Sequence, residues 1–257
     1  MSTASPIDVA RRAITLLDLT ELGDEATPDD VTALCARAVG RHGTVAAVCV
    51  WPRHVSMAVQ LLIGKGVRIA TVVNFPSGND AIDDVVALTT EALADGADEI
   101  DLVLPYRAFL SGDRAAAEAM IQAVRDSVPT PQRLKVILET GELVSYDTIR
   151  AASETAIRLG ADFIKTSTGK TPRSASLEAT EVMLEVIRTA SRPVGLKPSG
   201  GIRTLDDATE YLDQADRIMG AGWATPTTFR FGASGLLTAL EAAIDGASEP
   251  TSTTETY

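Results

Sequence analysis

Three ionisable residues stand in short apolar runs, where a charged side chain is costly. They are Lys165 in "GADFIKTSTGK", Lys197 in "GLKPSGG" and Asp101 in "GADEID". An ammonium group taken out of water is destabilising unless it is paired or loses its proton. The chain has only five lysines beside eighteen arginines, and lysine, unlike arginine, can lose its proton and act as a nucleophile. We therefore expect Lys165 to be a reactive amine.

Two amines and one carboxylate in one site are suited to Schiff-base chemistry. An unperturbed lysine has a pKa of about 10.4, so about one amine in a few thousand is neutral at pH 7. A second cation lowers the pKa of its neighbour, and the neutral amine is the form that attacks a carbonyl. The alternative is a buried Lys165–Asp101 ion pair that only stabilises the fold, but it leaves Lys197 unexplained.

The apolar runs predict an α/β fold, a single TIM (β/α)8 barrel. Eight candidate strands, each followed by a helical stretch, recur about every 30 residues, and most are near-continuously apolar, as parallel strands covered on both faces are. The candidate strands are "LLDLT", "VAAVCVWP", "RIATVVNFP", "EIDLVLP", "LKVILETG", "FIKTSTG", "GLKPSGG" and "RIMGAG". We expect residues 1–245 to form the barrel domain with a short N-terminal helical segment, and the polar residues 246–257 to form a flexible tail.

A short internal repeat predicts which residues share a layer inside this barrel. The segments "GADEID", "GADFIK" and "ADRIM" have an Ala-Asp-x-Ile core and fall at candidate strands 4, 6 and 8. Alternate strands contribute to one layer, so Asp101, Lys165 and Met219 should lie at a similar height. The alternative is a chance match, because Gly-Ala-Asp commonly follows a helix.

The composition argues against several classes of partner and cofactor. With 23 basic and 35 acidic residues the net charge is −12, which disfavours nucleic acid and anionic membranes as partners. No leader segment or membrane-spanning run is evident, so we expect a cytoplasmic location. Cys35 and Cys49 are expected to be buried thiols rather than a disulfide or metal site. With His42 and His54 as the only histidines, we expect no metal and no other cofactor.

Three glycine-containing loops at one end of the predicted barrel indicate a phosphate site. "TSTGK" follows candidate strand 6, "PSGGIRT" follows strand 7, and "RFGASGLL" opens an apolar helix. Glycine lets backbone N–H groups approach an oxyanion, and a helix N-terminus adds partial positive charge. TIM barrels often bind phosphate at their seventh and eighth loops. A single loop of this kind is more often an ordinary turn than a phosphate site, but three at one end of the barrel favour phosphate.

Taken in order, eight motifs resemble those of the deoxyribose-phosphate aldolase family. They run from "LLDLT" near Leu16 through "VCVWP", "ATVVNFPSG", "GADEIDLVLPYRA", "LKVILETGEL" and "GADFIKTSTGK" to "GLKPSGGIRT" and "RFGAS". The resemblance implies a TIM-barrel class I aldolase of deoxyribonucleotide catabolism that needs no metal. It implies reversible cleavage of 2-deoxy-D-ribose 5-phosphate to D-glyceraldehyde 3-phosphate and acetaldehyde.

The resemblance also implies a role for each matching residue. Lys165 would be the Schiff-base nucleophile, Lys197 the lysine that perturbs it, and Asp101 a carboxylate that moves protons through a water. Asp18 would support Lys197, unless it only caps a loop or helix. Tyr257 would reach the site on a flexible tail to help proton transfer, unless the tail is merely solvated. Phosphate would be bound by Gly169, Lys170, Gly200, Gly201, Arg203, Gly232 and Ser234.

One departure from the family pattern keeps other functions open. Gly235 stands where the family often has a second serine, and a lost hydroxyl could weaken phosphate binding by about 1 kcal/mol. One alternative is another Schiff-base aldolase acting on a different phosphorylated sugar; a second is a non-catalytic phosphosugar-binding protein. Sequence does not settle whether the chain forms a homo-oligomer.

Overall fold

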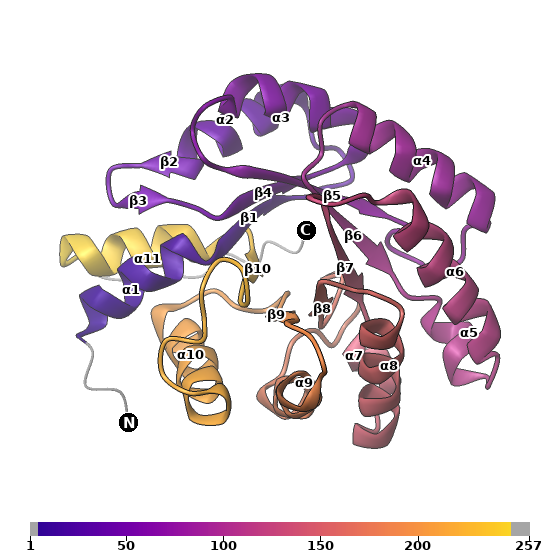
Figure 1. Cartoon of the computed structure of the whole chain (residues 1–257). Helices are drawn as coiled ribbons and strands as arrows, with labels where there is room; N and C mark the ends of the chain where they lie inside the picture. Colours follow the sequence, from indigo (N-terminus) through magenta and orange to yellow (C-terminus); the bar gives the residue numbers. More distant parts are fainter. Residues whose placement is uncertain (1–4, 248–257) are drawn as a thin grey trace.

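The protein is a parallel barrel surrounded by helices, seen in a computed structural model that describes residues 5–247 (Figure 1). Eight strands pair in the order β10-β1-β4-β5-β6-β7-β8-β9, all in parallel. Parallel bridges Leu196–Phe229 and Ser199–Gly232 join the two ends of this order. The prediction of a TIM barrel is therefore confirmed.

The barrel strands are short and almost wholly buried. Their bounds are β1 Leu17–Glu21, β4 Ala47–Val50, β5 Arg68–Val73, β6 Glu99–Val103, β7 Arg133–Ile137, β8 Phe163–Lys165, β9 Gly195–Lys197 and β10 Phe231–Ala233. Two further short strands, β2 Val39–Gly40 and β3 Gly43–Thr44, form a separate antiparallel hairpin.

Helices follow each barrel strand and cover the outside of the barrel. Their bounds are α1 Pro6–Thr15, α2 Pro28–Ala38, η1 Pro52–His54, α3 Val55–Leu62, α4 Ile82–Ala94, α5 Tyr106–Leu110, α6 Arg114–Ser127, α7 Thr140–Leu143, α8 Tyr146–Arg158, α9 Leu177–Thr189, α10 Leu205–Met219 and α11 Leu236–Asp245. Helix α1 precedes the first strand and packs beside α11 (Figure 1). No helix within residues 5–247 is long and apolar enough to cross a membrane.

Seven of the eight predicted strands are confirmed, and the eighth is wrong. "RIMGAG" contains the last turn of α10, which ends at Met219, and the eighth strand is β10 in "RFGAS". The run Arg217–Met219 continues the amphipathic pattern of α10, whose Thr204–Asp207 capping box fixes the helix start. Met219 therefore does not share an interior layer with Asp101 and Lys165.

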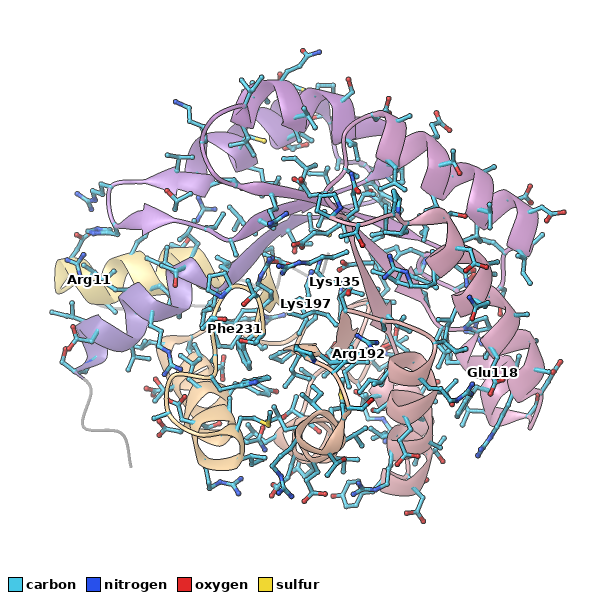
Figure 2. All side chains as sticks on the ribbon, viewed as in Figure 1. Arg11, Glu118, Lys135, Arg192, Lys197 and Phe231 are labelled. Carbon is cyan, nitrogen blue, oxygen red and sulfur yellow. The ribbon has the colours of Figure 1, made fainter. Side chains whose placement is uncertain are left out.

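Strand alternation separates an apolar outer core from a charged interior. In β6, Ile100 and Leu102 belong to the apolar core beneath the helices, whereas Glu99 and Asp101 point into the barrel. The same alternation turns Ile164 outward and Lys165 inward on β8. Figure 2 shows Lys135 and Lys197 inside the ring of strands, with Arg11 and Glu118 on the outside. Both cysteines are buried and unpaired, as expected.

Packing inside the barrel depends on a missing side chain at Gly195. A Cβ atom at this position would lie 2.2 Å from the Phe163 ring on the neighbouring strand. We predict that Gly195→Ala destabilises the fold by about 1–3 kcal/mol, because the buried ring has to shift. Urea unfolding would measure this as a lower midpoint at unchanged slope.

The matched control is Gly235→Ala, because nothing lies within 4 Å of a Cβ atom there and φ is −87°. We expect it to cost less than about 1 kcal/mol, the scale of changes at a helix N-cap. Equal midpoint shifts in the two variants would contradict the packing argument.

Candidate active site

The two predicted lysines meet over one carboxylate. Lys165 Nζ lies 3.0 Å from Asp101 Oδ2, and Lys197 Nζ lies 2.8 Å from the same oxygen. Both lysines end their strands, β8 and β9, which are neighbours with Lys165 in register with Lys197. All three side chains are at most 3% exposed. The structure therefore brings Lys165, Lys197 and Asp101 into one group.

Lys165 is the amine in this group that is easiest to deprotonate. Burial lowers its pKa, and the neighbouring ammonium of Lys197 lowers it further. The ion pair with Asp101 raises the pKa but does not overcome these two effects. Part of the shift comes from Lys197, as the sequence suggested, but burial contributes more. A neutral amine here is a nucleophile ready to attack a carbonyl carbon.

Lys197 stays protonated because it faces two carboxylates. Its Nζ lies 2.5 Å from Asp18 Oδ2 and 2.8 Å from Asp101 Oδ2. Burial alone would lower its pKa, but Asp101 and Asp18 raise it well above the ordinary value. Asp18 lies in β1, fully buried, so it is neither a loop residue nor a helix cap.

The sequence reasoning missed three charged residues that extend this site into the barrel. Lys135 Nζ lies 2.6 Å from Asp101 Oδ1 and 2.7 Å from Glu99 Oε2. The Arg230 guanidinium binds Asp18 at 2.5 Å and Glu99 at 2.9 Å. The sequence held two signals for these residues. Lys135 interrupts an apolar run as Lys165 does, and Glu99 lies two residues before Asp101, so both side chains are on the same face of the strand.

These contacts keep the Asp101 carboxylate ionised. Burial alone would raise its pKa, but the ammonium groups of Lys135, Lys197 and Lys165 lower it well below the usual value. The site thus joins a neutral-prone amine, a charged amine and a carboxylate within hydrogen-bond distance. A family model described as DeoC/LacD family aldolase matches residues 12–241.

The chain belongs to the DeoC/LacD family of aldolases.

Individual relatives agree with this aldolase assignment. A deoxyribose-phosphate aldolase of Agrobacterium fabrum is 54% identical over 239 residues, which is 92% of each chain. A solved structure from Toxoplasma gondii ME49, described as a candidate deoxyribose-phosphate aldolase, has a TM-score of 0.85 at 26% identity. The match covers 94% of this chain and 96% of the Toxoplasma gondii chain. The tetrameric deoxyribose phosphate aldolase of Aeropyrum pernix has a TM-score of 0.72 at 26% identity, and the match covers 93% of this chain and 92% of the Aeropyrum chain.

The glycine-containing loops of this aldolase meet at the mouth of the barrel. A Cβ atom at Gly200 would lie 3.3 Å from Gly169 Cα, so the loops after β8 and β9 touch. Gly200 N–H donates to the carbonyl of Gly232, which brings in β10. Gly169, Gly200 and Gly201 all have φ near +83°, a conformation that favours glycine. The structure therefore brings the three predicted phosphate loops together.

The remaining predicted phosphate residues lie on the same rim. Lys170 Nζ reaches across it to Asp24 Oδ1 at 2.8 Å, in the loop after β1. Arg203 precedes α10, and its backbone N–H donates to Asp207. Ser234 immediately precedes Gly235, the N-cap of α11, where no side chain caps the helix. Tyr257 lies outside the described residues 5–247.

A buried glutamate, also missed from the sequence, holds the loop that carries Lys170. Glu139 follows β7 with a φ of 57°, and its carboxylate accepts hydrogen bonds from Thr168 N–H, Thr168 Oγ1 and Thr171 Oγ1. Burial raises its pKa, and the bonds from Thr168 and Thr171 act against that rise. This carboxylate therefore positions the Gly169–Lys170 turn from beneath.

The geometry predicts how Lys197 acts. Replacing Lys197 with leucine removes an ammonium group that lowers the pKa of Lys165. Of the three lysines, Asp101 then contacts only Lys165 and Lys135, so the pKa of Lys165 rises. We expect Lys197→Leu to lower kcat/KM at pH 7 by tenfold or more and to move the acid limb of the pH profile upward. A rate loss with an unchanged pH profile would assign Lys197 to substrate binding instead.

Proposed function

We propose that this aldolase is a class I lyase that reversibly cleaves 2-deoxy-D-ribose 5-phosphate to D-glyceraldehyde 3-phosphate and acetaldehyde. The observation that carries the proposal is the single Asp101 oxygen shared by Lys165 and Lys197. A purely structural ion pair needs one lysine; a second lysine on the same oxygen keeps the first uncharged. The 54% identity to the Agrobacterium fabrum deoxyribose-phosphate aldolase supports this choice of substrate.

The proposed reaction begins with attack by neutral Lys165 Nζ on the aldehyde carbon of the open-chain sugar. Loss of water from the carbinolamine leaves a protonated imine, which withdraws electrons from the bond between C2 and C3. Removal of the C3 hydroxyl proton breaks that bond, releasing D-glyceraldehyde 3-phosphate and leaving an enamine. Protonation at C2 and hydrolysis of the imine then release acetaldehyde and restore the amine.

In this proposal the other residues hold charge or move protons. Lys197 stays charged and keeps Lys165 neutral, with Asp18 holding Lys197 in place. Asp101 accepts and returns protons through a water. Tyr257 remains a prediction as an additional proton donor at C2.

The substrate phosphate is proposed to bind at the rim. Backbone N–H groups of the glycine loops, the N-terminus of α11 and the cations Lys170 and Arg203 would provide a local positive site on a protein of net charge −12. Gly169, Gly200, Gly201, Gly232 and Ser234 complete the proposed set. The Lys170–Asp24 ion pair would have to open for Lys170 to bind the phosphate.

Assembly and location remain predictions. The Aeropyrum pernix relative is a tetramer, which makes a homo-oligomer a reasonable proposal for this chain. We propose a small phosphosugar as the substrate, with neither nucleic acid nor membrane as a partner, and a cytoplasmic location.

Reduction with borohydride in the presence of acetaldehyde tests the mechanism directly. Borohydride converts an imine to a stable secondary amine, which peptide mass spectrometry locates. We predict an adduct on Lys165 alone, because it is the neutral-prone amine at the end of β8. Lys165→Arg removes the amine nucleophile and should give no adduct and no activity.

An adduct on Lys197 would reverse the two roles. An active enzyme that forms no adduct would exclude the Schiff-base mechanism. Activity with another phosphorylated sugar, and trapping without activity on deoxyribose 5-phosphate, would favour the other Schiff-base aldolase.

Substitution at Gly235 tests the phosphate site. A serine side chain has room there, since nothing lies within 4 Å of its Cβ position. We predict that Gly235→Ser lowers KM for deoxyribose 5-phosphate about fivefold, the equivalent of one hydrogen bond of about 1 kcal/mol. KM for unphosphorylated deoxyribose should stay unchanged, and Gly235→Ala, which adds no hydroxyl, should match the native enzyme on both sugars. Equal effects on the two sugars would show that this position does not bind phosphate.

A further inference from the structure

The charged side chains inside the barrel form one connected group, here called the interior charge cluster. Each member lies within 4.0 Å of an oppositely charged member, and none is more than 3% exposed. The members are Asp18, Glu99, Asp101, Lys135, Lys165, Lys197 and Arg230. The cluster thus holds four basic and three acidic groups.

Because basic groups outnumber acidic groups by one, the cluster carries a net charge unless one basic group loses its proton. A net charge in a low-dielectric interior is unfavourable, so the cluster is most stable when one basic group is neutral and three cations face three carboxylates. Arginine does not deprotonate in proteins, which leaves the three lysines. The question is which lysine gives up its proton.

The contacts select Lys165. Lys135 lies within 4.0 Å of three carboxylates: Asp18 at 3.5 Å, Glu99 at 2.7 Å and Asp101 at 2.6 Å. Lys197 lies within this distance of two carboxylates. Lys165 contacts Asp101 alone, on an oxygen that Lys197 approaches more closely. The proton on Lys165 is therefore the least stabilised of the three.

We propose that Lys135 is a positioning residue for the aldol reaction: it supplies the third cation that balances the interior carboxylates, so that Lys165 remains uncharged. It does so through Asp101, whose Oδ1 it binds while Oδ2 stays with Lys165 and Lys197. The inference rests on the proposed function, because only a Schiff-base reaction needs Lys165 neutral.

Other groups facing Lys165 do not alter this balance. Cys49 on β4 is a buried thiol whose pKa is raised by burial, so it stays uncharged near neutral pH. Glu139 beyond β7 already accepts hydrogen bonds from three donors of Thr168 and Thr171. Glu139 interacts electrostatically with Lys165, but among the described residues it forms no ion pair with Lys165 within 4.0 Å. The charged groups that act most strongly on Lys165 are Lys197 and Asp101, both of them members of the cluster.

The test is a pH profile of kcat/KM and of borohydride trapping at Lys165 with acetaldehyde. In Lys135→Met two cations would face three carboxylates, so a protonated Lys165 becomes favourable. We expect the acid limb of both profiles to move up by about one pH unit, with about a tenfold loss near neutral pH that is recovered at alkaline pH. Lys65→Met removes the same charge from an exposed turn and should leave both profiles unchanged.

Glu99 provides the rescue variant. Lys135→Met/Glu99→Gln restores equal numbers, two cations and two carboxylates, and should return the acid limb toward its native position. Glu99→Gln alone leaves three cations with two carboxylates and should shift the limb the other way, to lower pH. This variant keeps the proposal testable if Lys135→Met does not fold.

The outcomes separate this proposal from the proposed function. Failure of the native enzyme to trap acetaldehyde at Lys165 would overturn the function itself. Trapping at Lys165 with a profile that neither Lys135→Met nor Glu99→Gln shifts would leave the function intact and overturn the role of Lys135. A Lys135→Met profile that the Glu99→Gln change does not restore would also overturn it, because the effect would not follow charge.

Discussion

The site depends on one carboxylate, Asp101, bound by three lysines. Lys135 takes one oxygen, and Lys165 and Lys197 share the other. Three ammonium groups around one carboxylate lie close enough to repel one another, and the group with the fewest other anions loses its proton most easily. Lys165 is therefore the easiest of the three to deprotonate because, within the interior charge cluster, it contacts one carboxylate, whereas Lys197 contacts two and Lys135 three.

The barrel makes this arrangement possible because closure brings distant strands together. Lys165 and Lys197 lie 64 and 96 positions from Asp101 along the chain. Parallel strands turn alternate residues inward, so β1, β6, β7, β8 and β9 each contribute one or two charged side chains to a common interior, and Arg230 adds one directly before β10. The apolar side chains between them face the helices, where burial stabilises the fold and offsets the cost of the buried charges.

Much of the fold and the centre of the site could be predicted from local patterns. Apolar runs at regular spacing identified seven of the eight strands, and lysines within such runs identified Lys165 and Lys197. A charged residue in an apolar strand is costly unless it is paired or neutral, so the lysines in such runs pointed to special roles. "RIMGAG" misled because a short apolar run looks the same at the end of a helix and in a strand. Only α10 packing and the pairing of β10 with β1 separate the two.

Local sequence patterns were enough to predict the barrel class, seven of its strands, the charged strand ends and the glycine loops, because alternation and turn conformation are properties of neighbouring residues. Tertiary structure decided which charges meet. Lys135 stood in an apolar run with no assigned role, and its contact with Asp101 forms only when β7 pairs with β6. Arg230 began the "RFGAS" motif, also with no assigned role, and its contact with Asp18 forms only in the folded barrel. A protonation state depends on distances to all surrounding charges, and these distances are set only when the barrel closes.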